Sequence, residues 1–405
     1  MKVYSHSSAM EPMLPSDNRD LSELALQLAK STARLGGCVH PITGQRIAAL
    51  VRSMNSYYSN LIEGHNTHPL EIERALKHDF SNDPAQRALQ IESAAHIQVQ
   101  EILENRLREI RELPICELES LCWIHRELYA RLPEAFRFVK TKNGNTDEVI
   151  PGQLRRAEVE VGRHIAPRAE SLPKFLARFS AAYKPSSLDP LTRIIAVAAS
   201  HHRLAWIHPF LDGNGRVARL FTHASLTQSG LGGYGLWTIS RGFARRKDEY
   251  LSALSAADAP RWNDYDGRGN LSDLGLAAFC KFFLECCLDQ VQFMTGLLDF
   301  DTILERIRFF GDRWVREHKA DERIVALLQQ AFLRGELTRG ETTQVLLRPE
   351  RTTRRIISDL IAGGLLASEG PAKPVSLGFP MEAIGFYFPK LYPEGVEMEL
   401  LWKKK

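Results

Sequence analysis

The 405-residue sequence is poor in cysteine, has no long apolar run and carries little net charge. Its six cysteines form no Cys-x-x-Cys pair and no zinc-site spacing, so neither a zinc module nor a disulfide scaffold is expected. The formal net charge of +3 is too small to indicate nucleic-acid or membrane binding by itself. The thiols are therefore expected to be buried or free in a reducing compartment. They are Cys38, Cys116, Cys122, Cys280, Cys286 and Cys287.

The sequence also lacks an apolar stretch near its start and one of membrane-spanning length. Residues 1–18 contain no apolar run, so we expect no signal peptide. The most apolar long stretch, residues 276–293, is broken by Lys281, Glu285 and Asp289, which is typical of an amphipathic core helix. The 44% apolar and 25% charged fractions are those of ordinary globular proteins. We therefore expect a cytoplasmic protein with two or three domains.

What the sequence does contain is a dense polar stretch at residues 208–219, which reads His-Pro-Phe-Leu-Asp-Gly-Asn-Gly-Arg-Val-Ala-Arg. The glycines at 213 and 215 allow positive φ and close approach of the backbone to a ligand. Apolar residues at helical spacing follow over 217–226, so this turn leads into a helix. A helix N-terminus has free backbone N–H groups and a favourable dipole for an anion. The stretch therefore predicts an anion site.

The side chains of the stretch are suited to phosphate chemistry. His208 can act as a general base on a hydroxyl group. Asp212 precedes the turn and can hold a Mg²⁺ ion that bridges phosphate oxygens. Arg216 and Arg219 lie three residues apart in the first helical turn, so both can reach one polyphosphate. Phe210 is expected to anchor the loop in the core. No Gly-Lys-Ser/Thr follows, which disfavours a Walker-type ATPase.

This stretch resembles the Fic family signature, His-x-Phe-x-(Asp/Glu)-Gly-Asn-Gly-(Arg/Lys)-x-x-Arg, at every specified position. The resemblance implies nucleotidyl transfer, most often of AMP from Mg·ATP to a Ser, Thr or Tyr hydroxyl of a protein with release of pyrophosphate. It makes His208 the base, Asp212 the Mg²⁺ ligand and Arg216 and Arg219 the holders of the outer phosphates. The segment Gly213, Asn214 and Gly215 becomes the anion hole.

Other reactions of the same site remain open at this point. Removal of AMP, or transfer of UMP, phosphate or another phosphate-linked group, needs the same residues, since ligand orientation chooses the phosphorus that is attacked. A transcription regulator whose Fic core only senses nucleotide is the alternative from another class. The intact His208 disfavours it, because sensing needs no base.

A second stretch, Ser59-Asn60-Leu61-Ile62-Glu63-Gly64, resembles the inhibitory-helix signature of Fic proteins, (Ser/Thr)-x-x-x-Glu-(Gly/Asn). The resemblance implies that Glu63 pairs with Arg219. A carboxylate on that arginine occupies the place of a γ-phosphate and repels the incoming anion. The sequence therefore predicts an enzyme that inhibits itself until Glu63 is displaced.

Two further segments are linked to the site by the resemblance. Residues 138–167 contain a turn signal at Asn143-Gly144 and a strand-like alternation over 158–162, and relatives have a β-hairpin flap here that docks the target by strand addition. Residues 152–155 resemble the Gly-x-x-Arg element before that flap. Tyr250 belongs to a Tyr-x-x-x-Leu pattern at the adenine pocket, although Arg246 stands where many relatives have Asn.

Three other histidines are not expected to be ligands: His201 and His202 are interpreted as residues that pack in the core or support the site, and His125 as a packed or surface residue. His201 and His202 are adjacent on an expected helix, so their side chains diverge, and with His208 they fit no common zinc spacing. His125 lies within another expected helix. We expect none of the three to bind a metal.

The predicted fold class is mainly α: a Fic-type helical core with a small β-hairpin flap, plus a C-terminal winged helix-turn-helix. We divide the chain into an N-terminal helical region with the inhibitory helix (1–112), a catalytic core (113–300), a linker helix (301–320) and the winged-helix domain (321–405). The helices of the first three parts are expected at residues 21–35, 43–62, 69–78, 86–113, 116–132, 172–183, 191–205, 217–226, 238–254 and 274–294.

The tail domain is expected to contain helices at 323–333, 339–346 and 349–361, a turn at Gly363-Gly364 and a strand at 383–388. Four arginines give its third helix a basic face suited to phosphate contacts, so DNA is a candidate partner and protein docking the alternative. They are Arg348, Arg351, Arg354 and Arg355. The other expected partners are ATP and a protein with a target hydroxyl, which could be the chain itself. The sequence leaves a homodimer open.

Overall fold

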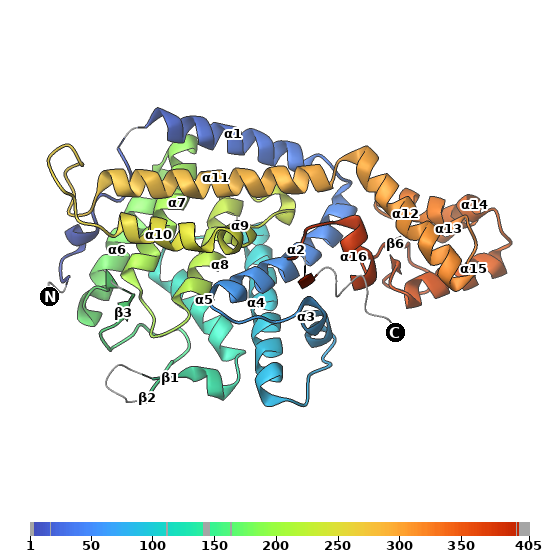
Figure 1. The fold of residues 1–405 in the computed structure, drawn as a ribbon, viewed down its shortest axis with the longest axis horizontal. Coiled ribbons are helices and arrows are strands. Elements are labelled where there is room, and N and C mark those ends of the chain that lie inside the picture. The colour runs from blue at the N-terminus through green and yellow to red at the C-terminus, as the bar shows by residue number, and fades with distance from the viewer. Residues whose placement is uncertain are drawn as a thin grey trace.

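The computed structural model describes residues 4–16, 18–110, 112–140, 146–162, 164–393 and 395–396. It is mainly helical, as the sequence predicts, with short two-stranded pairs (Figure 1). The helices up to the tail are α1 (Arg19–Gly36), α2 (Pro41–Ile62), α3 (Pro69–Leu76), α4 (Pro84–Glu109), α5 (Leu118–Ala130), α6 (Leu172–Tyr183), α7 (Pro190–Ile207), α8 (Asn214–Gln228), α9 (Ile239–Arg245), α10 (Lys247–Ala257), α11 (Asp273–Leu297) and α12 (Phe300–His318).

Helix α8 lies at the centre of the larger part of the molecule. It packs against α7, α4, α5 and α2, while α11 covers α7, α9 and α10 (Figure 1). Because it is enclosed, almost every residue from Asn214 to Leu226 is buried, including two arginines. Buried charges need partners, so the arginines of α8 must be paired by neighbouring helices.

The junction between α7 and α8 is built from local backbone rules. Asp189 caps α7 by accepting hydrogen bonds from the N–H groups of Leu191 and Thr192 at 3.0 and 3.1 Å. The helix ends where His208 adopts a left-handed conformation with φ of +49°. Gly213, with φ of +78°, then precedes the first residue of α8. The predicted Gly-rich turn into a helix is therefore present.

Two predicted helices have different boundaries in the structure. The helix expected over 86–113 ends at Glu109, because Ile110 is extended. The single helix expected over 238–254 is divided at Arg246, whose φ and ψ of −117° and 40° are not helical. The guanidinium of Arg246 binds Glu249 at 2.6 Å and lies 4.6 Å from the ring of Phe282, which fixes the break.

The segment expected to form a flap contains two short antiparallel pairs. Strand β1 (Phe138–Lys140) pairs with β2 (Thr146–Glu148), and β3 (Glu160–Val161) pairs with β4 (His164–Ile165). The predicted strand over 158–162 is thus partly correct. The turn predicted at Asn143-Gly144 lies outside the described residues.

The tail places three helices before a strand pair, in the predicted order. They are α13 (Ile324–Arg334), α14 (Arg339–Leu346) and α15 (Glu350–Ala362), followed by β5 (Leu366–Ala367) and β6 (Ser376–Leu377). The strand predicted over 383–388 is wrong, because α16 (Met381–Tyr387) occupies it. Pro380 can begin a helix, and Ala383, Ile384 and Tyr387 are buried at helical spacing. The winged-helix assignment stays a prediction.

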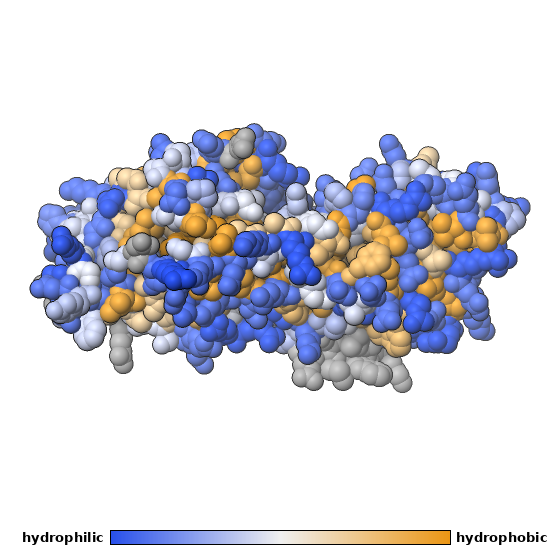
Figure 2. Space-filling model, turned by 90° about the horizontal axis from the view of Figure 1, so that it is seen from above, coloured by the Kyte–Doolittle hydropathy of each residue, from blue (hydrophilic) through white to orange (hydrophobic). Residues whose placement is uncertain are grey.

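The tail packs onto α2. The hydroxyl of Thr43 donates to the Phe332 carbonyl at 2.7 Å, and the hydroxyl of Tyr58 donates to the Leu391 carbonyl at 2.9 Å. Figure 2 shows polar side chains over much of the face seen from above, with apolar residues between them. Among the described helices, none has the length and apolar character needed to cross a membrane.

Candidate functional site

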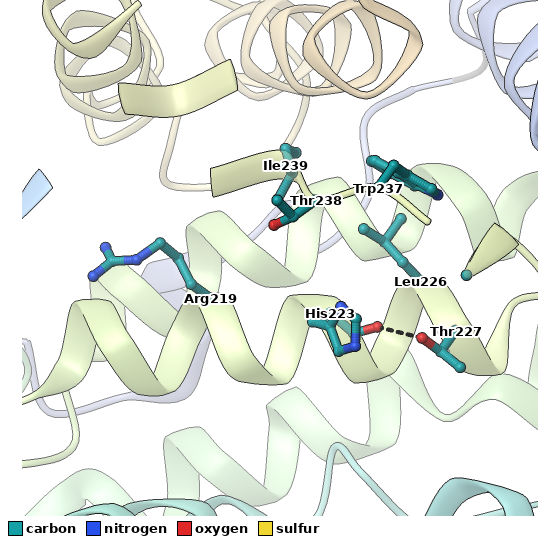
Figure 3. Close-up of a pocket in the computed structure, with 8 residues that line it drawn as sticks. Arg219, His223, Leu226, Thr227, Trp237, Thr238 and Ile239 are labelled. Carbon is teal, nitrogen blue, oxygen red and sulfur yellow. Dashed lines mark hydrogen bonds between the residues drawn. The ribbon is translucent and has the colours of Figure 1, made fainter. Parts of the chain in front are cut away.

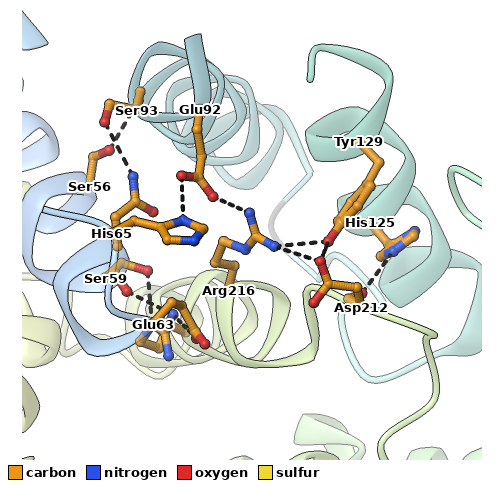
Figure 4. Close-up of polar contacts among 12 residues, drawn as sticks. Ser56, Ser59, Glu63, His65, Glu92, Ser93, His125, Tyr129, Asp212 and Arg216 are labelled. Atoms are coloured by element: carbon orange, nitrogen blue, oxygen red, sulfur yellow. Dashed lines mark hydrogen bonds and ion pairs between the residues drawn. The ribbon is translucent and has the colours of Figure 1, made fainter. Parts of the chain in front are cut away.

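The candidate site lies where the first turn of α8 meets the end of α2 and the sides of α4 and α5 (Figure 4). Arg219 therefore lies against Glu63, which is 156 residues earlier in the sequence, and Arg216 and Asp212 lie close enough to influence its carboxylate. The fold explains this convergence, since α2, α4 and α5 all pack against α8.

His208 is placed to act as a base. Its Nδ1 lies 3.3 Å from the Ala205 carbonyl oxygen, so a proton on Nδ1 would leave Nε2 as the acceptor. Burial lowers the pKa of His208 to about 4, against an ordinary value of 6.5. The ring is therefore neutral near pH 7, which is the form that can accept a proton.

The backbone around His208 is fixed by Arg155, which belongs to the predicted Gly-x-x-Arg element. Its Nε donates to the His208 carbonyl at 2.8 Å, and its own N–H donates to the Pro209 carbonyl at 3.0 Å. The guanidinium also donates to the carbonyls of Ala157 and Pro167. Arg155 thus ties the segment after β2 to the motif loop.

The turn after His208 is held by its own side chains. The Asn214 amide accepts from the Phe210 N–H at 2.9 Å and donates to the Phe210 carbonyl at 2.8 Å. Phe210 is fully buried and stacks on His125 with ring centroids 4.1 Å apart. A Cβ added at Gly213 would lie 2.5 Å from a ring carbon of Tyr129, so glycine is required there. The Asn214 side chain is therefore committed to the loop, and Phe210 lies where an anchor is expected.

Asp212 has the chemistry of a Mg²⁺ ligand. Its Oδ2 accepts from the Tyr129 hydroxyl at 2.6 Å and lies 3.3 Å from Arg216, while the side chain remains 45% exposed. Burial would raise the pKa of Asp212, but Arg216 and the Tyr129 hydroxyl outweigh it and the net pKa is lowered. A partly exposed, ionised carboxylate is the hard oxygen donor that Mg²⁺ prefers. The residue fits the predicted role.

Arg216 binds protein side chains through both of its terminal nitrogens, while its buried Nε has no hydrogen-bond partner among the described residues. Its Nη1 is paired with Oε1 of Glu92, and its Nη2 donates to the Tyr129 hydroxyl at 2.8 Å. Burial alone would lower the pKa of Arg216, but Tyr129, Glu92 and Asp212 raise it overall. The guanidinium of Arg216 is therefore always charged and is held in one orientation.

Glu63 and Arg219 are brought together as the sequence predicts. Oε1 of Glu63 lies 2.6 Å from Nη2 of Arg219, whose Nε and Nη2 also donate to the Ser59 hydroxyl and carbonyl at 2.8 and 3.0 Å. A Cβ added at Gly215 would overlap Oε1 of Glu63, so this carboxylate lies against the first turn of α8. Burial would raise the pKa of Glu63, but Arg219 and then Arg216 lower it below its ordinary value. A protein carboxylate therefore occupies the predicted anion site.

Tyr250 is buried in an aromatic cluster. Its hydroxyl lies 2.8 Å from Nε2 of His201, and its ring stacks on Phe243 at 4.2 Å. His201 also bonds the Thr222 hydroxyl at 2.7 Å, and Nε2 of His202 lies 3.0 Å from Asp258. His201 and His202 thus make polar contacts inside the fold. Tyr250 is therefore buried, and it lies close to Arg219 and Glu63 of the site.

A small hollow lies beside α8 on the far side of Arg219 from the motif loop (Figure 3). It runs along the helix toward its C-terminus, past His223 and Thr227, and Trp237 also lines it. Its position differs from that of the predicted phosphate site, which Glu63 fills. The hollow shares Arg219 with the predicted nucleotide site, and its other lining residues lie outside the motif.

Sequence reasoning missed Glu92, His65 and Tyr129. Glu92 is fully buried on α4, and its Oε2 lies 2.7 Å from Nδ1 of His65. A signal existed for Glu92, because it interrupts an otherwise small and apolar helix face together with Ser93 and His96. His65 and Tyr129 have no such signal in the sequence. Only their contacts in the folded structure identify them.

Comparison with known proteins supports one family. Residues 115–226 match the Fic/DOC family, a span that includes the motif but not Glu63, His65 or Glu92. The protein adenylyltransferase Fic of Nematostella vectensis is 30% identical over 174 residues, which are 43% of this chain and 37% of that protein. The protein of the same name from Drosophila mojavensis is 32% identical over 105 residues, which are 26% and 21% of the two chains.

A solved structure supports the fold. A Fic family protein from Desulfovibrio desulfuricans G20 aligns with a TM-score of 0.52 and 17% identity, over 90% of this chain and 98% of that chain. Identity this low shows the fold alone. The alignments with the two curated relatives span about a fifth and well under half of those proteins.

Proposed function

We propose that this chain, which belongs to the Fic family through the domain at residues 115–226, is a protein adenylyltransferase. It would move AMP from Mg·ATP to a Ser, Thr or Tyr hydroxyl of a protein and release pyrophosphate. The observation that carries the proposal is a neutral, half-buried His208 next to a helix N-terminus with two arginines in its first two turns. The names of the curated relatives agree with it.

Each group has a role that its position allows. Nε2 of His208 would take the proton of the attacking hydroxyl as that oxygen bonds to the α-phosphorus. The backbone N–H groups of Gly213 to Gly215 would bind phosphate oxygens, and Arg219 would bind the outer phosphates. Asp212 would hold the Mg²⁺ ion, which supplies positive charge to the phosphate oxygens when bound. The leaving group is pyrophosphate.

The resting state would be self-inhibited. Glu63 satisfies Arg219 and lies against Gly215, so a γ-phosphate and the Glu63 carboxylate compete for one place. A charge-assisted pair of this kind must break before ATP binds productively. The proposal therefore includes an activating event that moves the end of α2.

Intact-mass spectrometry after incubation with Mg·ATP tests the reaction. The Glu63→Gly variant is expected to gain the mass of an adenylyl group faster than the wild type. Glu63→Gly/His208→Ala is expected to lose at least about 100-fold in rate, because it lacks the base. A protein that gains a phosphoryl or uridylyl mass when offered the matching nucleotide, but no adenylyl mass, would contradict AMP transfer and favour a neighbouring reaction.

We also propose that the tail binds DNA through α15. Arg351, Arg354 and Arg355 are exposed on this helix, and the Arg354 side chain is 79% exposed beside Glu350. Arg348 is instead paired with Asp321 at 2.6 Å, so it contributes less than the sequence predicts. Exposed arginines on one helix face are suited to phosphate contacts.

A gel-shift titration with duplex DNA at several salt concentrations tests this second function. We expect binding that weakens as salt rises and that is lost in Arg354→Glu/Arg355→Glu. Arg19→Glu/Arg34→Glu, on two exposed residues of α1, serves as the charge-matched control. DNA affinity that does not fall as salt rises would contradict a DNA-binding α15. An equal loss of DNA binding in the α15 variant and the control would contradict it too.

A further inference from the structure

The buried carboxylate of Glu92 connects two groups that the proposed mechanism treats separately. One of its oxygens pairs with Arg216, and the other lies 2.7 Å from Nδ1 of His65 (Figure 4). Arg216 belongs to the motif, whereas His65 lies two residues after Glu63. A single carboxylate on α4 thus touches both the phosphate-binding helix and the inhibitory segment.

The segment around Glu63 has a short and defined geometry. Gly64 has φ of +90°, and its N–H donates to the Leu61 carbonyl at 3.1 Å. The N–H of His65 then donates to the Asn60 carbonyl at 2.9 Å. This arrangement satisfies the last carbonyls of α2 and turns the chain sharply. Glu63 and His65 therefore project from one tight turn, and the two side chains cannot move independently over more than a short distance.

The His65 contact is the last in a row of polar contacts that join α2 to α4. They are Asn55 with Gln100 at 2.7 Å, Ser56 with the Ser93 carbonyl at 3.0 Å, Asn60 with the Ser93 hydroxyl at 3.2 Å and His65 with Glu92 at 2.7 Å. The first three involve buried groups within the helices. His65 is more open, with a side chain 37% exposed, while Glu92 is fully buried. The His65 contact is therefore the one that can open without unpacking the two helices.

We propose that the His65–Glu92 contact is a latch that holds Glu63 over Arg219 in the resting state. It rests on the proposed function, since it assumes that Glu63 competes with the γ-phosphate. With His65 held by α4, the turn at Gly64 keeps the Glu63 carboxylate against Gly215. Release of His65 lets the turn move and lets Glu63 leave Arg219 without changing either residue. His65 is thus a positioning residue for the inhibitor.

The latch can open because the Glu92 carboxylate is stabilised by two partners, Arg216 and His65. A buried carboxylate requires compensating donors, and removal of one leaves its oxygen unsatisfied. Arg216 remains on Glu92 when His65 leaves, so opening costs one hydrogen bond to a charged group and leaves Arg216 in place. The latch therefore opens more readily than the Glu92–Arg216 pair does.

Four variants test the latch: His65→Ala, His65→Asn, Glu63→Gly and Glu63→Gly/His65→Ala. The two readouts are the dissociation constant of Mg·ATP and the rate of self-modification by intact mass. His65→Ala is expected to bind Mg·ATP about 10-fold more tightly than the wild type, because a hydrogen bond to a charged group no longer opposes opening. His65→Asn retains a donor and should stay close to the wild type. In the Glu63→Gly background the His65 change should have no effect.

The outcomes separate the latch from the proposed function. Equal Mg·ATP affinity of His65→Ala and the wild type would overturn the latch. An equal gain in Mg·ATP affinity from His65→Ala with and without Glu63 would also overturn it, because the effect of His65 would then not depend on the inhibitory carboxylate. Failure of Glu63→Gly to acquire AMP would overturn the proposed transfer, while the affinity measurements would still decide on the latch. Partial unfolding of His65→Ala cannot produce the expected result, since it would weaken ATP binding.

Discussion

At the scale of single residues, the site depends on a few groups whose environment sets their charge. His208 is half-buried, and it is neutral because loss of contact with water lowers its pKa to about 4. Its backbone is left-handed, which ends α7. Asp212 and Glu63 remain ionised because neighbouring arginines outweigh their burial. Asp212 and the neutral imidazole of His208 are the combination that a metal-assisted transfer to a hydroxyl needs, whereas Glu63 pairs with Arg219.

The lowered pKa of His208 predicts the pH dependence of the reaction. The active form is the neutral ring, so activity is present above the folded pKa and is lost as the pH falls through it. In Glu63→Gly, the rate of AMP transfer should stay nearly level from about pH 5.5 to 8 and fall only as the pH approaches about 4. A pH series of intact-mass measurements checks this. An inflection at 6.5, the ordinary histidine value, would contradict the buried base.

The sequence predicts the residues of the motif better than their partners. Glu63 and Arg219 were expected to pair because both lie in recognisable patterns, and they do. Glu92 and Tyr129 bind Arg216 from helices far away in the sequence. Glu92 is marked only as a polar residue on a mostly small and apolar helix face, and no local pattern marks Tyr129. Arg216 was expected to hold the outer phosphates together with Arg219, whereas its burial requires these protein partners.

At the scale of elements, the site depends on two helices, α2 and α8. Helix α8 presents its N-terminus to the site, and α2 ends at the same point with Ser59 and Glu63 on Arg219. The long helices were predictable from their apolar spacing, and α6 matches its expected bounds. The break at Arg246 was not, because it depends on contacts with Glu249 and Phe282.

The short elements were the hardest to predict. Residues 383–388 alternate in a way that also suits a strand, but Pro380 and the buried face of Ala383, Ile384 and Tyr387 favour the helix α16. Strands of two or three residues, such as β3 and β5, have too few side chains for a period to appear. Their pairing is decided by the tertiary fold.

At the scale of the whole molecule, α2 joins the tail to the site. It is held by the tail at Thr43 and Tyr58 and reaches Arg219 through Glu63. The domain division expected from the sequence treats residues 321–405 as separate, yet the tail contacts the same helix that carries the inhibitor. The mainly helical fold was predictable from composition and spacing, while this docking was not, since it depends on surfaces that meet only in the folded chain.

The central claim is that the Glu63 carboxylate competes with the outer phosphate of ATP for Arg219. The most direct measurement is the dissociation constant of Mg·ATP for the wild type, Glu63→Gln and Glu63→Gly, with Glu23→Gln on an exposed part of α1 as the control. We expect Glu63→Gly to bind at least about tenfold more tightly than the wild type, with Glu63→Gln between them and Glu23→Gln unchanged. Equal affinities for the wild type and both Glu63 variants would contradict the account.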